Sequence, residues 1–193
     1  MPWEKSFDED AVVGKAMKVF WEKGYAATSI NDLIKGTGVG RGSLYNAFGG
    51  KQALFVQALS KYYAENHRAT LAELEALDDP LNAIRSLFNA VLQETIEDKE
   101  KKGCFLINTT LELRTHDAKT QAVIKKAHAE TIAFFRRCIE VGQARKDMPS
   151  SVDAMATAKV LLSLVIAIRV LGRGAFNERD LREIADQAER LLI

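Results

Sequence analysis

Basic and hydroxyl side chains that can bind a nucleic acid lie close together near the N-terminus. Arg41 and Ser43 follow a glycine-rich stretch, and Tyr45 and Lys51 come soon after them. A guanidinium group can donate to guanine acceptors or to a phosphate, and hydroxyl and ammonium groups can hold phosphates. These residue types at this spacing predict contacts with phosphates and base edges.

Charge is distributed unevenly along the chain, although its 193 residues carry a net charge of only +1. Residues 11–68 hold eight Lys and Arg against three Asp and Glu, whereas residues 69–193 hold 18 against 19. A basic segment joined to a nearly neutral body favours a polyanionic partner for that segment. A solvated helix surface would have the same composition, so charge alone leaves that alternative open.

Three short helices are predicted to position these side chains, over residues 8–23, 29–35 and 41–48. Apolar residues recur in them at helical spacing, and the glycines between the second and third permit a sharp turn. Two short helices joined by such a turn form a helix-turn-helix, whose second helix enters the major groove. Small residues at Gly42 and Ser43 would let that helix approach base edges closely.

This region resembles the DNA-binding region of the TetR family. The resemblance rests on the runs Gly24–Ile30 and Gly42–Phe55 and on the pair Gly38–Val39 between them. It implies a three-helix DNA-binding domain, here residues 1–50, and a C-terminal helical domain, residues 51–193, that dimerises and usually binds a small-molecule inducer. The predicted DNA-binding residues are Thr28, Ser29, Arg41, Gly42, Ser43, Tyr45, Asn46 and Lys51.

Three positions depart from the family pattern. Gly40 stands where the family usually has Ser or Thr, so the third helix should have a weaker N-terminal cap. Ala47 replaces a common His or Tyr, which removes one possible phosphate contact, and Ile34 replaces a small residue. The later run Gly103–Thr109 is similar to one subgroup of the family, which extends the resemblance into the body.

The remainder of the chain is also predicted to be helical, so the fold class is all-α. Helices are expected over about 51–77, 80–99, 103–114, 117–144, 152–172 and 177–192. Helical bundles bind ligands in apolar cavities between helices. Candidate lining residues, each with an equally plausible role in the core, are Phe88, Leu92, Cys104, Phe105, Asn108, Ile132 and Phe135.

The last two helices are predicted to form a homodimer interface. The penultimate helix is apolar on more than one face, and such a helix must be covered on both sides. Its most apolar stretch, Val160–Leu171, is shorter than the roughly 20 residues that span a bilayer, so no membrane partner is expected. The predicted interface residues are Val160, Leu161, Leu164, Val165, Ile168 and Leu171.

No catalytic or metal-binding pattern is present in the sequence. It has no phosphate loop, no dinucleotide fingerprint and no nucleophile elbow. His67, His116 and His128 lie far apart, and their spacing from Cys104 and Cys138 gives no support to a metal site. We therefore expect no enzyme activity, no metal and no cofactor. The two cysteines and the absence of a signal-peptide pattern favour the cytoplasm.

These observations predict a ligand-responsive transcriptional regulator, a repressor that a small molecule releases from double-stranded operator DNA. Three alternatives stay open. The regulator could be controlled by thiol chemistry at Cys104, which follows two lysines near a helix start. It could activate rather than repress, or the chain could be a helical small-molecule-binding protein without DNA binding. The inducer, the operator and the regulated genes are not encoded in any motif.

Overall fold

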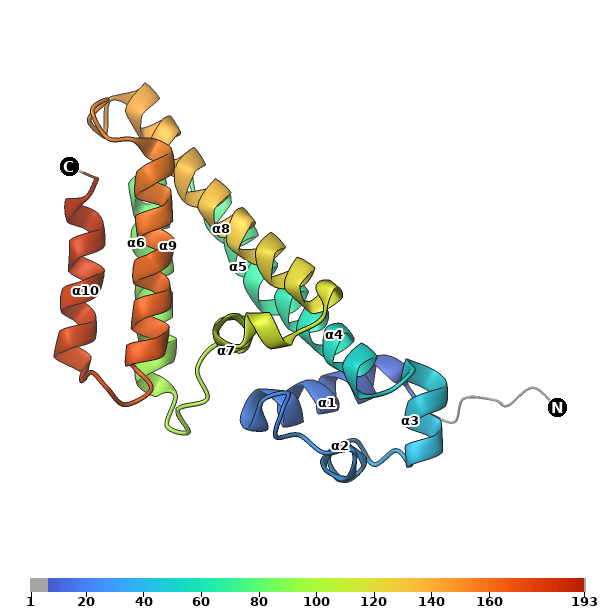
Figure 1. Cartoon of the computed structure of the whole chain (residues 1–193). Coiled ribbons are helices and arrows are strands. Elements are labelled where there is room, and N and C mark those ends of the chain that lie inside the picture. The colour runs from blue at the N-terminus through green and yellow to red at the C-terminus, as the bar shows by residue number, and fades with distance from the viewer. Residues whose placement is uncertain (1–6, 193) are drawn as a thin grey trace.

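The computed structural model describes residues 7–192 and contains α-helices, one π-helical turn, one 3₁₀ turn and, within those residues, no strand. The first three helices form a small unit at one end of the molecule, and the long helices of the body rise from it (Figure 1). The expectation that residues 1–6 hold no signal peptide lies outside the described residues. The all-α prediction is confirmed.

The first three helices follow the predicted boundaries closely. They are α1 (Glu9–Lys23), α2 (Ile30–Thr37) and α3 (Arg41–Phe48). The Asp8 carboxylate caps α1 by accepting the Asp10 N–H at 2.9 Å.

The predicted helix over 51–77 is one rod with an irregular centre. It consists of α4 (Lys51–Tyr62), the π-helical turn η1 (Tyr63–Arg68) and α5 (Ala69–Glu75). In Figure 1 this rod runs diagonally beside α8 and joins the N-terminal helices to the body. Single π-helical turns inside α-helices often occur at functional sites. Residue periodicity did not indicate this one.

The rest of the body contains five α-helices and one 3₁₀ turn. Asp79, Asp117, Asp153 and Asn177 cap four of the helices through their side chains. The elements are α6 (Pro80–Glu97), α7 (Phe105–Leu111), η2 (Leu113–Thr115), α8 (Ala118–Arg145), α9 (Ala154–Leu171) and α10 (Glu178–Arg190).

The helix predicted from Gly103 begins at Phe105 instead. Gly103 has a left-handed φ of 68°, which no helix interior accepts, and Cys104 is the N-cap. The helix also ends at Leu111 rather than near Arg114, where a separate 3₁₀ turn forms.

Two hydrophobic clusters form the core. The first contains Phe20 and Leu33 of the N-terminal helices, but also Phe55 of α4, Phe105 of α7 and Ile124 of α8. The second lies among α6, α8, α9 and α10. The N-terminal core is therefore not confined to residues 1–50, and a division of the chain at residue 50 stays a prediction.

The apolar helix α9 is longer than the stretch Val160–Leu171 suggested. The 18 residues of Ala154–Leu171 have a mean hydropathy of 2.0, and among the described residues this is the one helix both long and apolar enough to cross a membrane by length and composition alone. The expectation that it is too short was wrong on length. Four residues of the helix, Ala158, Leu161, Val165 and Ile168, are buried against the chain's own body. This packing explains part of its apolar character without a bilayer.

Candidate DNA interface and ligand cavity

Side-chain hydrogen bonds hold both ends of α2, including the turn that leads into α3. Ser29 and Asp32 form a reciprocal capping box at the start of α2, with contacts of 3.1 and 2.8 Å. A hydrogen bond from Lys23, together with Ser29, holds the pKa of Asp32 far below its usual range. At the other end, Gly38 adopts a left-handed conformation with φ 76°, and the Val39 N–H donates to the Thr37 hydroxyl at 3.2 Å. The left-handed Gly38 and the Thr37–Val39 bond therefore hold the turn from which the chain enters α3.

Helix α3 is anchored by one face and exposed on the other. Leu44 and Phe48 are 3% and 5% exposed and belong to the N-terminal core, as predicted. No side chain caps the helix at Gly40, which agrees with the weaker cap expected there. The helix is held by its apolar contacts and not by its N-terminus.

The exposed face of α3 carries polar side chains that form no hydrogen bond or ion pair within the described residues. Arg41, Tyr45 and Asn46 are exposed, Ser43 is half-buried and Tyr45 is 47% exposed. Within residues 7–192 none of these four side chains takes part in a hydrogen bond or ion pair. Their donors and acceptors are free to meet an outside partner. An added Cβ at Gly42 would also meet open space.

The hydroxyl groups of two predicted DNA-contact residues, Thr28 and Ser29, form hydrogen bonds within the chain. Thr28 is fully buried, and its hydroxyl donates to the Gly24 carbonyl at 2.6 Å. The expectation that this hydroxyl faces a phosphate was wrong, because the hydroxyl is buried and its hydrogen bond closes the turn after α1. Ser29 is exposed, but its hydroxyl belongs to the capping box with Asp32.

Lys51 lies at the junction between the N-terminal helices and the rod. Its ammonium group stands 4.4 Å from the centre of the Tyr25 ring, and partial burial lowers its pKa. Tyr25 in turn packs on Phe55 at 4.8 Å and on His116 at 5.3 Å. A phosphate contact by Lys51 stays a prediction. Such a contact would act directly on the aromatic cluster, because the Lys51 ammonium group lies over the Tyr25 ring.

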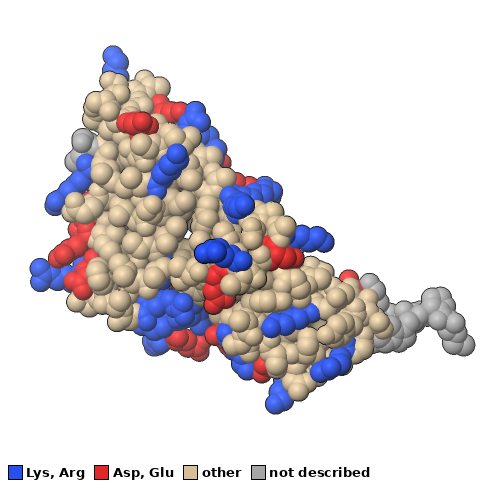
Figure 2. Space-filling model, viewed as in Figure 1, with Lys and Arg blue, Asp and Glu red and all other residues tan. Residues whose placement is uncertain are grey.

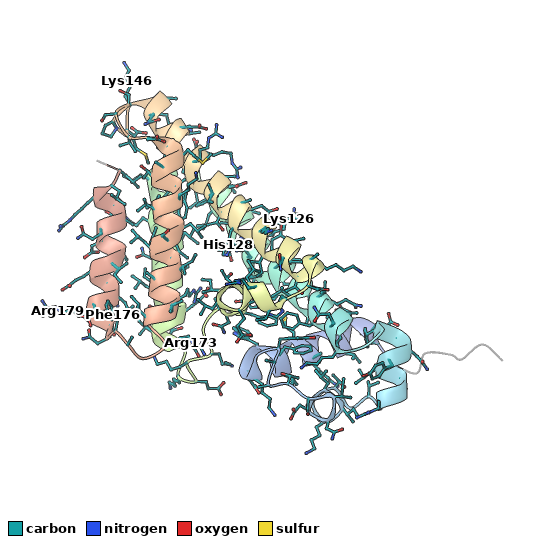
Figure 3. All side chains as sticks on the ribbon, in the orientation of Figure 1. Lys126, His128, Lys146, Arg173, Phe176 and Arg179 are labelled. Carbon is teal, nitrogen blue, oxygen red and sulfur yellow. The ribbon has the colours of Figure 1, made fainter. Side chains whose placement is uncertain are left out.

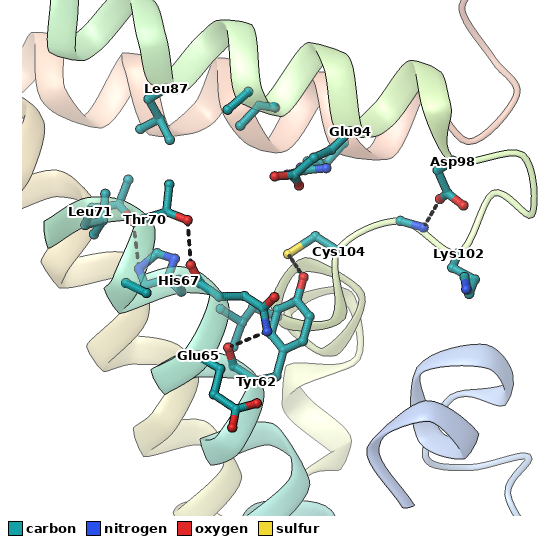
Figure 4. Close-up of a pocket in the computed structure, with 18 of the residues that line it drawn as sticks. Tyr62, Glu65, His67, Thr70, Leu71, Leu87, Glu94, Asp98, Lys102 and Cys104 are labelled. Atoms are coloured by element: carbon teal, nitrogen blue, oxygen red, sulfur yellow. Dashed lines mark hydrogen bonds and ion pairs between the residues drawn. The ribbon is translucent and has the colours of Figure 1, made fainter. Parts of the chain in front are cut away.

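The body contains a cavity of about 560 Å³ between the rod and α6. Figure 4 shows Tyr62, Glu65, His67 and Thr70 on one wall and Leu87 and Glu94 on the facing helix. The segment before α7, from Asp98 to Cys104, closes one end. The π-helical turn supplies Glu65, Asn66 and His67 to this wall, and α5 supplies Ala69, Thr70, Leu71 and Glu73, so the irregular centre and the end of the rod both face the cavity.

The inner end of the cavity is polar and internally paired. The Tyr62 hydroxyl lies 3.7 Å from the Cys104 sulfur, and burial raises the pKa of Tyr62. Arg169 of α9 forms an ion pair with Glu94 and reaches the Thr95 hydroxyl at 3.4 Å. His67 donates from Nε2 to the Ala127 carbonyl at 3.1 Å, since a carbonyl can only accept.

One residue of the DNA-binding unit takes part in the cavity wall. Trp21 of α1 lines the cavity, and its indole N–H donates to the Gly103 carbonyl at 2.8 Å. A second, smaller hollow of about 190 Å³ lies on the other side of this contact, between Tyr25, Asn108 and Arg173. Figure 3 shows Arg173 reaching from the end of α9 toward this junction. The cavity and the DNA-binding unit therefore share a wall.

Only one of the predicted ligand residues, Cys104, lines the main cavity. Phe88 and Leu92 line a hollow of about 140 Å³ between α6 and α10. Phe105 and Asn108 lie in the hollow beside Trp21, while Ile132 and Phe135 pack in the core of the body. The predicted set consisted mostly of apolar residues at helical spacing, and such residues point into the core. No local signal marks the polar residues that do line the cavity, among them Tyr62, Glu65, His67, Glu94 and Arg169.

Comparisons with known proteins agree with this architecture. Residues 13–58 match the family model described as bacterial regulatory proteins, tetR family, and residues 80–185 match the model of the tetracyclin repressor-like C-terminal domain. The HTH-type transcriptional repressor ComR of Escherichia coli is 30% identical over 97% of this chain and 90% of its own length. The chain belongs to the TetR family.

Solved structures of other TetR-family regulators share the fold over nearly the whole chain. NemR of Escherichia coli, in its reduced form, superimposes with a TM-score of 0.86 at 17% identity and covers 95% of this chain and 96% of its own. A cysteine mutant of the regulator CifR, solved with 26-base-pair operator DNA, gives 0.81 at 25% identity and covers 96% and 97%. The interpretation as a helical protein unrelated to DNA-binding regulators is thereby set aside.

The residues predicted for the dimer interface of this TetR-family chain divide into two sets. Leu161, Val165 and Ile168 are 0%, 8% and 0% exposed and pack into the chain's own body, so their assignment to an interface was wrong. Val160 is 44% exposed, and Leu164 and Leu171 are half-buried. Figure 2 shows a broad uncharged surface over α9 in this view. Val160, Leu164 and Leu171 form the outer stripe of α9, which remains available for contact with a second copy of the chain.

Proposed function

We propose that this TetR-family regulator is a homodimeric repressor that binds operator DNA through α3 and leaves it when a small molecule fills the cavity. The proposal rests chiefly on the exposed face of α3, where Arg41, Tyr45 and Asn46 have no partners within residues 7–192. The named relatives include repressors and a DNA-bound structure, which supports the same role here. We assign the chain a binding role without a chemical reaction, in the cytoplasm.

The wall that the cavity shares with the N-terminal unit would allow ligand binding to change DNA binding. A molecule in the cavity would touch η1 and Trp21, so it would act on the rod and on α1 at once. Any change in the angle of the N-terminal unit would alter the distance between the two recognition helices of a dimer, which must match half-sites about 34–36 Å apart. Coupling of this kind is reciprocal, so operator DNA should weaken ligand binding by the factor by which ligand weakens DNA binding.

The direct test is a titration of the purified protein against duplexes from the region upstream of its own gene, with an unrelated duplex of equal length. Arg41→Ala should cost about 1–3 kcal/mol on the preferred duplex and reduce its advantage over the unrelated one. Lys125→Ala removes an exposed cation from α8, away from α3, and serves as the matched control. Equal binding to all duplexes at every salt concentration would contradict the proposal.

A second candidate mode of control is thiol chemistry at Cys104, because its sulfur lines the cavity beside the Tyr62 hydroxyl. Cys138 provides an internal comparison, since burial raises the pKa of its thiol to about 11. Mild oxidant or an electrophile should then modify Cys104 first and release DNA, while Cys104→Ser should keep its DNA under the same treatment. Release of DNA from Cys104→Ser to the same extent as from the wild type would exclude this mode.

A further inference from the structure

A smaller hollow of about 190 Å³, here called the junction hollow, lies where the N-terminal unit meets the body. It is enclosed by the end of α1, by Phe55 of α4, by α7 and by the residues that follow α7 and α9. Figure 3 shows Arg173, one of its wall residues, at the end of α9. Only Trp21 lines both this hollow and the main cavity, so a molecule could occupy either space alone.

One buried polar side chain in the wall of the junction hollow has no partner. His116 is 6% exposed, and within residues 7–192 neither nitrogen of its ring forms a hydrogen bond. The ring instead packs on Phe55 at 5.2 Å and on Tyr25 at 5.3 Å. A neutral imidazole has one N–H donor and one acceptor, and it is costly to leave such groups unbonded when they are buried. A ligand hydroxyl could serve either nitrogen, because a hydroxyl both donates and accepts.

The rest of the inner wall is aromatic. The rings of Trp21, Tyr25, Phe55 and Phe105 line the hollow, and Phe55 meets Phe105 edge to face at 5.6 Å. Such walls favour a planar ring through stacked and edge contacts. A cavity of about 150 Å³ accommodates benzene, whereas pockets for drug-sized ligands begin at about 300 Å³. A hollow of about 190 Å³ therefore suits one substituted ring.

The charged groups of the wall favour a neutral ligand. Lys23 is paired with Asp32, and Arg173 donates to a backbone carbonyl at 3.0 Å and to an amide oxygen at 3.1 Å. Glu22 and Glu112 are exposed and form no ion pair within residues 7–192. A ligand carboxylate would meet these two carboxylates beside one partly used guanidinium group. A neutral hydroxyl group would meet no such repulsion.

From these contacts we infer that the junction hollow is a second ligand site, which binds monocyclic phenols with the ring among the aromatic side chains and the hydroxyl group on His116. This site goes beyond the proposed function, because the proposed inducer fills the main cavity. A phenol bound there would touch both the end of α1 and α7, so it would lie beside the Trp21–Gly103 hydrogen bond that joins the two regions.

The test uses three probes that share one ring and differ in one group: 4-fluorophenol, 4-fluorotoluene and 4-fluorobenzoate. The methyl group of the toluene has nearly the size of a hydroxyl group but forms no hydrogen bond. Fluorine NMR titration of the full-length protein near neutral pH should give an affinity for the phenol about tenfold above that for the toluene, and the benzoate should bind more weakly than the phenol. Equal affinities for the phenol and the toluene, tighter binding of the benzoate, or no binding of any probe would each overturn the inference.

A histidine variant tests the hydrogen bond. His116→Phe keeps an aromatic ring against Phe55 and removes both nitrogens, so the affinity for 4-fluorophenol should fall about tenfold, to the level of 4-fluorotoluene. The affinity for 4-fluorotoluene should stay nearly the same. His128→Phe is the matched control and should change neither affinity, because His128 lines neither space and already contacts the Thr110 hydroxyl at 2.9 Å. An equal loss of phenol binding in both variants would contradict the site.

Two further variants locate the site without depending on the folding of His116→Phe. Glu112→Gln changes only an exposed side chain, and it should raise the affinity for 4-fluorobenzoate about twofold to threefold and leave that for the phenol unchanged. No gain for the benzoate would contradict a site beside Glu112. His67→Phe makes the histidine substitution in the main cavity. Loss of phenol binding in His67→Phe but not in His116→Phe would place the phenol in the main cavity and overturn the inference.

Operator binding measured in the same samples separates this inference from the proposed function. A protein that binds the phenol through His116 but binds no operator would keep the second site and refute the proposed repressor. A protein that binds its operator but none of the three probes would refute the second site and leave the proposed function intact.

Discussion

The two binding surfaces of this TetR-family protein handle their polar groups in opposite ways. On α3 the polar side chains Arg41, Tyr45 and Asn46 are exposed and unpaired within the described chain, and the apolar side chains of the helix pack against the N-terminal core. In the cavity polar groups are bonded to one another, as in the contact of Tyr62 with Cys104 and in the ion pair of the mostly buried Arg169 with the exposed Glu94.

The difference follows from what each surface is proposed to bind. DNA binds on the outer surface of a protein. The polar side chains that contact it can therefore remain hydrated in the free protein, which costs little free energy. A cavity removes its polar groups from water, and a buried polar group without a partner is costly. The cavity must therefore satisfy most of its groups internally, and a ligand can use only the few that remain.

The largest effect is expected from breaking the proposed dimer, which operator binding through two half-sites needs. Val160→Glu with Leu164→Glu places charge on the outer stripe of α9 and should give a folded monomer, since Val160 is 44% exposed. Loss of the second half-site contact should weaken operator binding about 10²- to 10⁴-fold. Sedimentation and helical content by circular dichroism test this together with DNA titration.

Two further variants serve as controls for the dimer prediction. Ala122→Glu with Ala129→Glu adds the same charge to exposed positions of α8 and should leave a dimer. Ile168→Glu should unfold the chain instead, because that side chain is fully buried. If the protein with Val160→Glu and Leu164→Glu sediments as a dimer at micromolar concentration, the dimer interface does not lie on the outer stripe of α9.

A pair of glycine substitutions should separate packing from DNA contact. An added Cβ at Gly172 would lie 2.2 Å from the Thr95 methyl carbon and 2.8 Å from the Ile168 carbonyl oxygen, so Gly172→Ala should cost about 1–3 kcal/mol of unfolding free energy. At Gly42 the same change meets open space, and higher helix propensity should add up to about 1 kcal/mol.

DNA binding should rank these two glycine variants in the reverse order. The new methyl group of Gly42→Ala projects from the exposed region of α3, where it would obstruct close approach to base edges. Gly172→Ala leaves α3 untouched, so the fraction that stays folded should bind with wild-type affinity. Denaturant unfolding and operator titration on both proteins check the reversal. Normal operator affinity of Gly42→Ala would argue against this part of α3 as the contact surface.

The same contrast explains how far the sequence alone could predict the molecule. The bounds of α1, α2 and α3 follow from caps, glycines and short-range apolar spacing, so they were predicted to within about two residues. The cavity depends on contacts between distant segments, such as Trp21 with Gly103, and on a π-helical turn. Those contacts leave no local pattern. Thr28 shows the limit within the motif, because its type suits a phosphate contact while its burial prevents one.

The smallest predicted effect concerns pH and the junction between the two regions. His116 is 6% exposed, stacks on Phe55 at 5.2 Å, and its Nδ1 has no hydrogen-bond partner within residues 7–192. Burial lowers its pKa, against the opposing effect of Glu112 and Asp117. The folded protein therefore binds fewer protons than the unfolded chain in mild acid, and the free energy of unfolding should fall as pH drops below about 6.5.

Replacing the histidine tests this linkage without removing the stacked ring. His116→Phe keeps an aromatic ring against Phe55 and deletes the unpartnered nitrogen, so it should be at least as stable as the wild type at pH 7.5. Between pH 7.5 and 5.5 its Tm should fall by less than that of the wild type, by a few degrees at most, because 1 kcal/mol corresponds to about 2–4 °C in a chain of this size. His67 and His128, whose pKa values are also lowered by burial, would supply the remaining pH dependence. Parallel melting curves for the two proteins across that pH range would show that His116 contributes nothing and that the acid sensitivity arises at the cavity side of the junction.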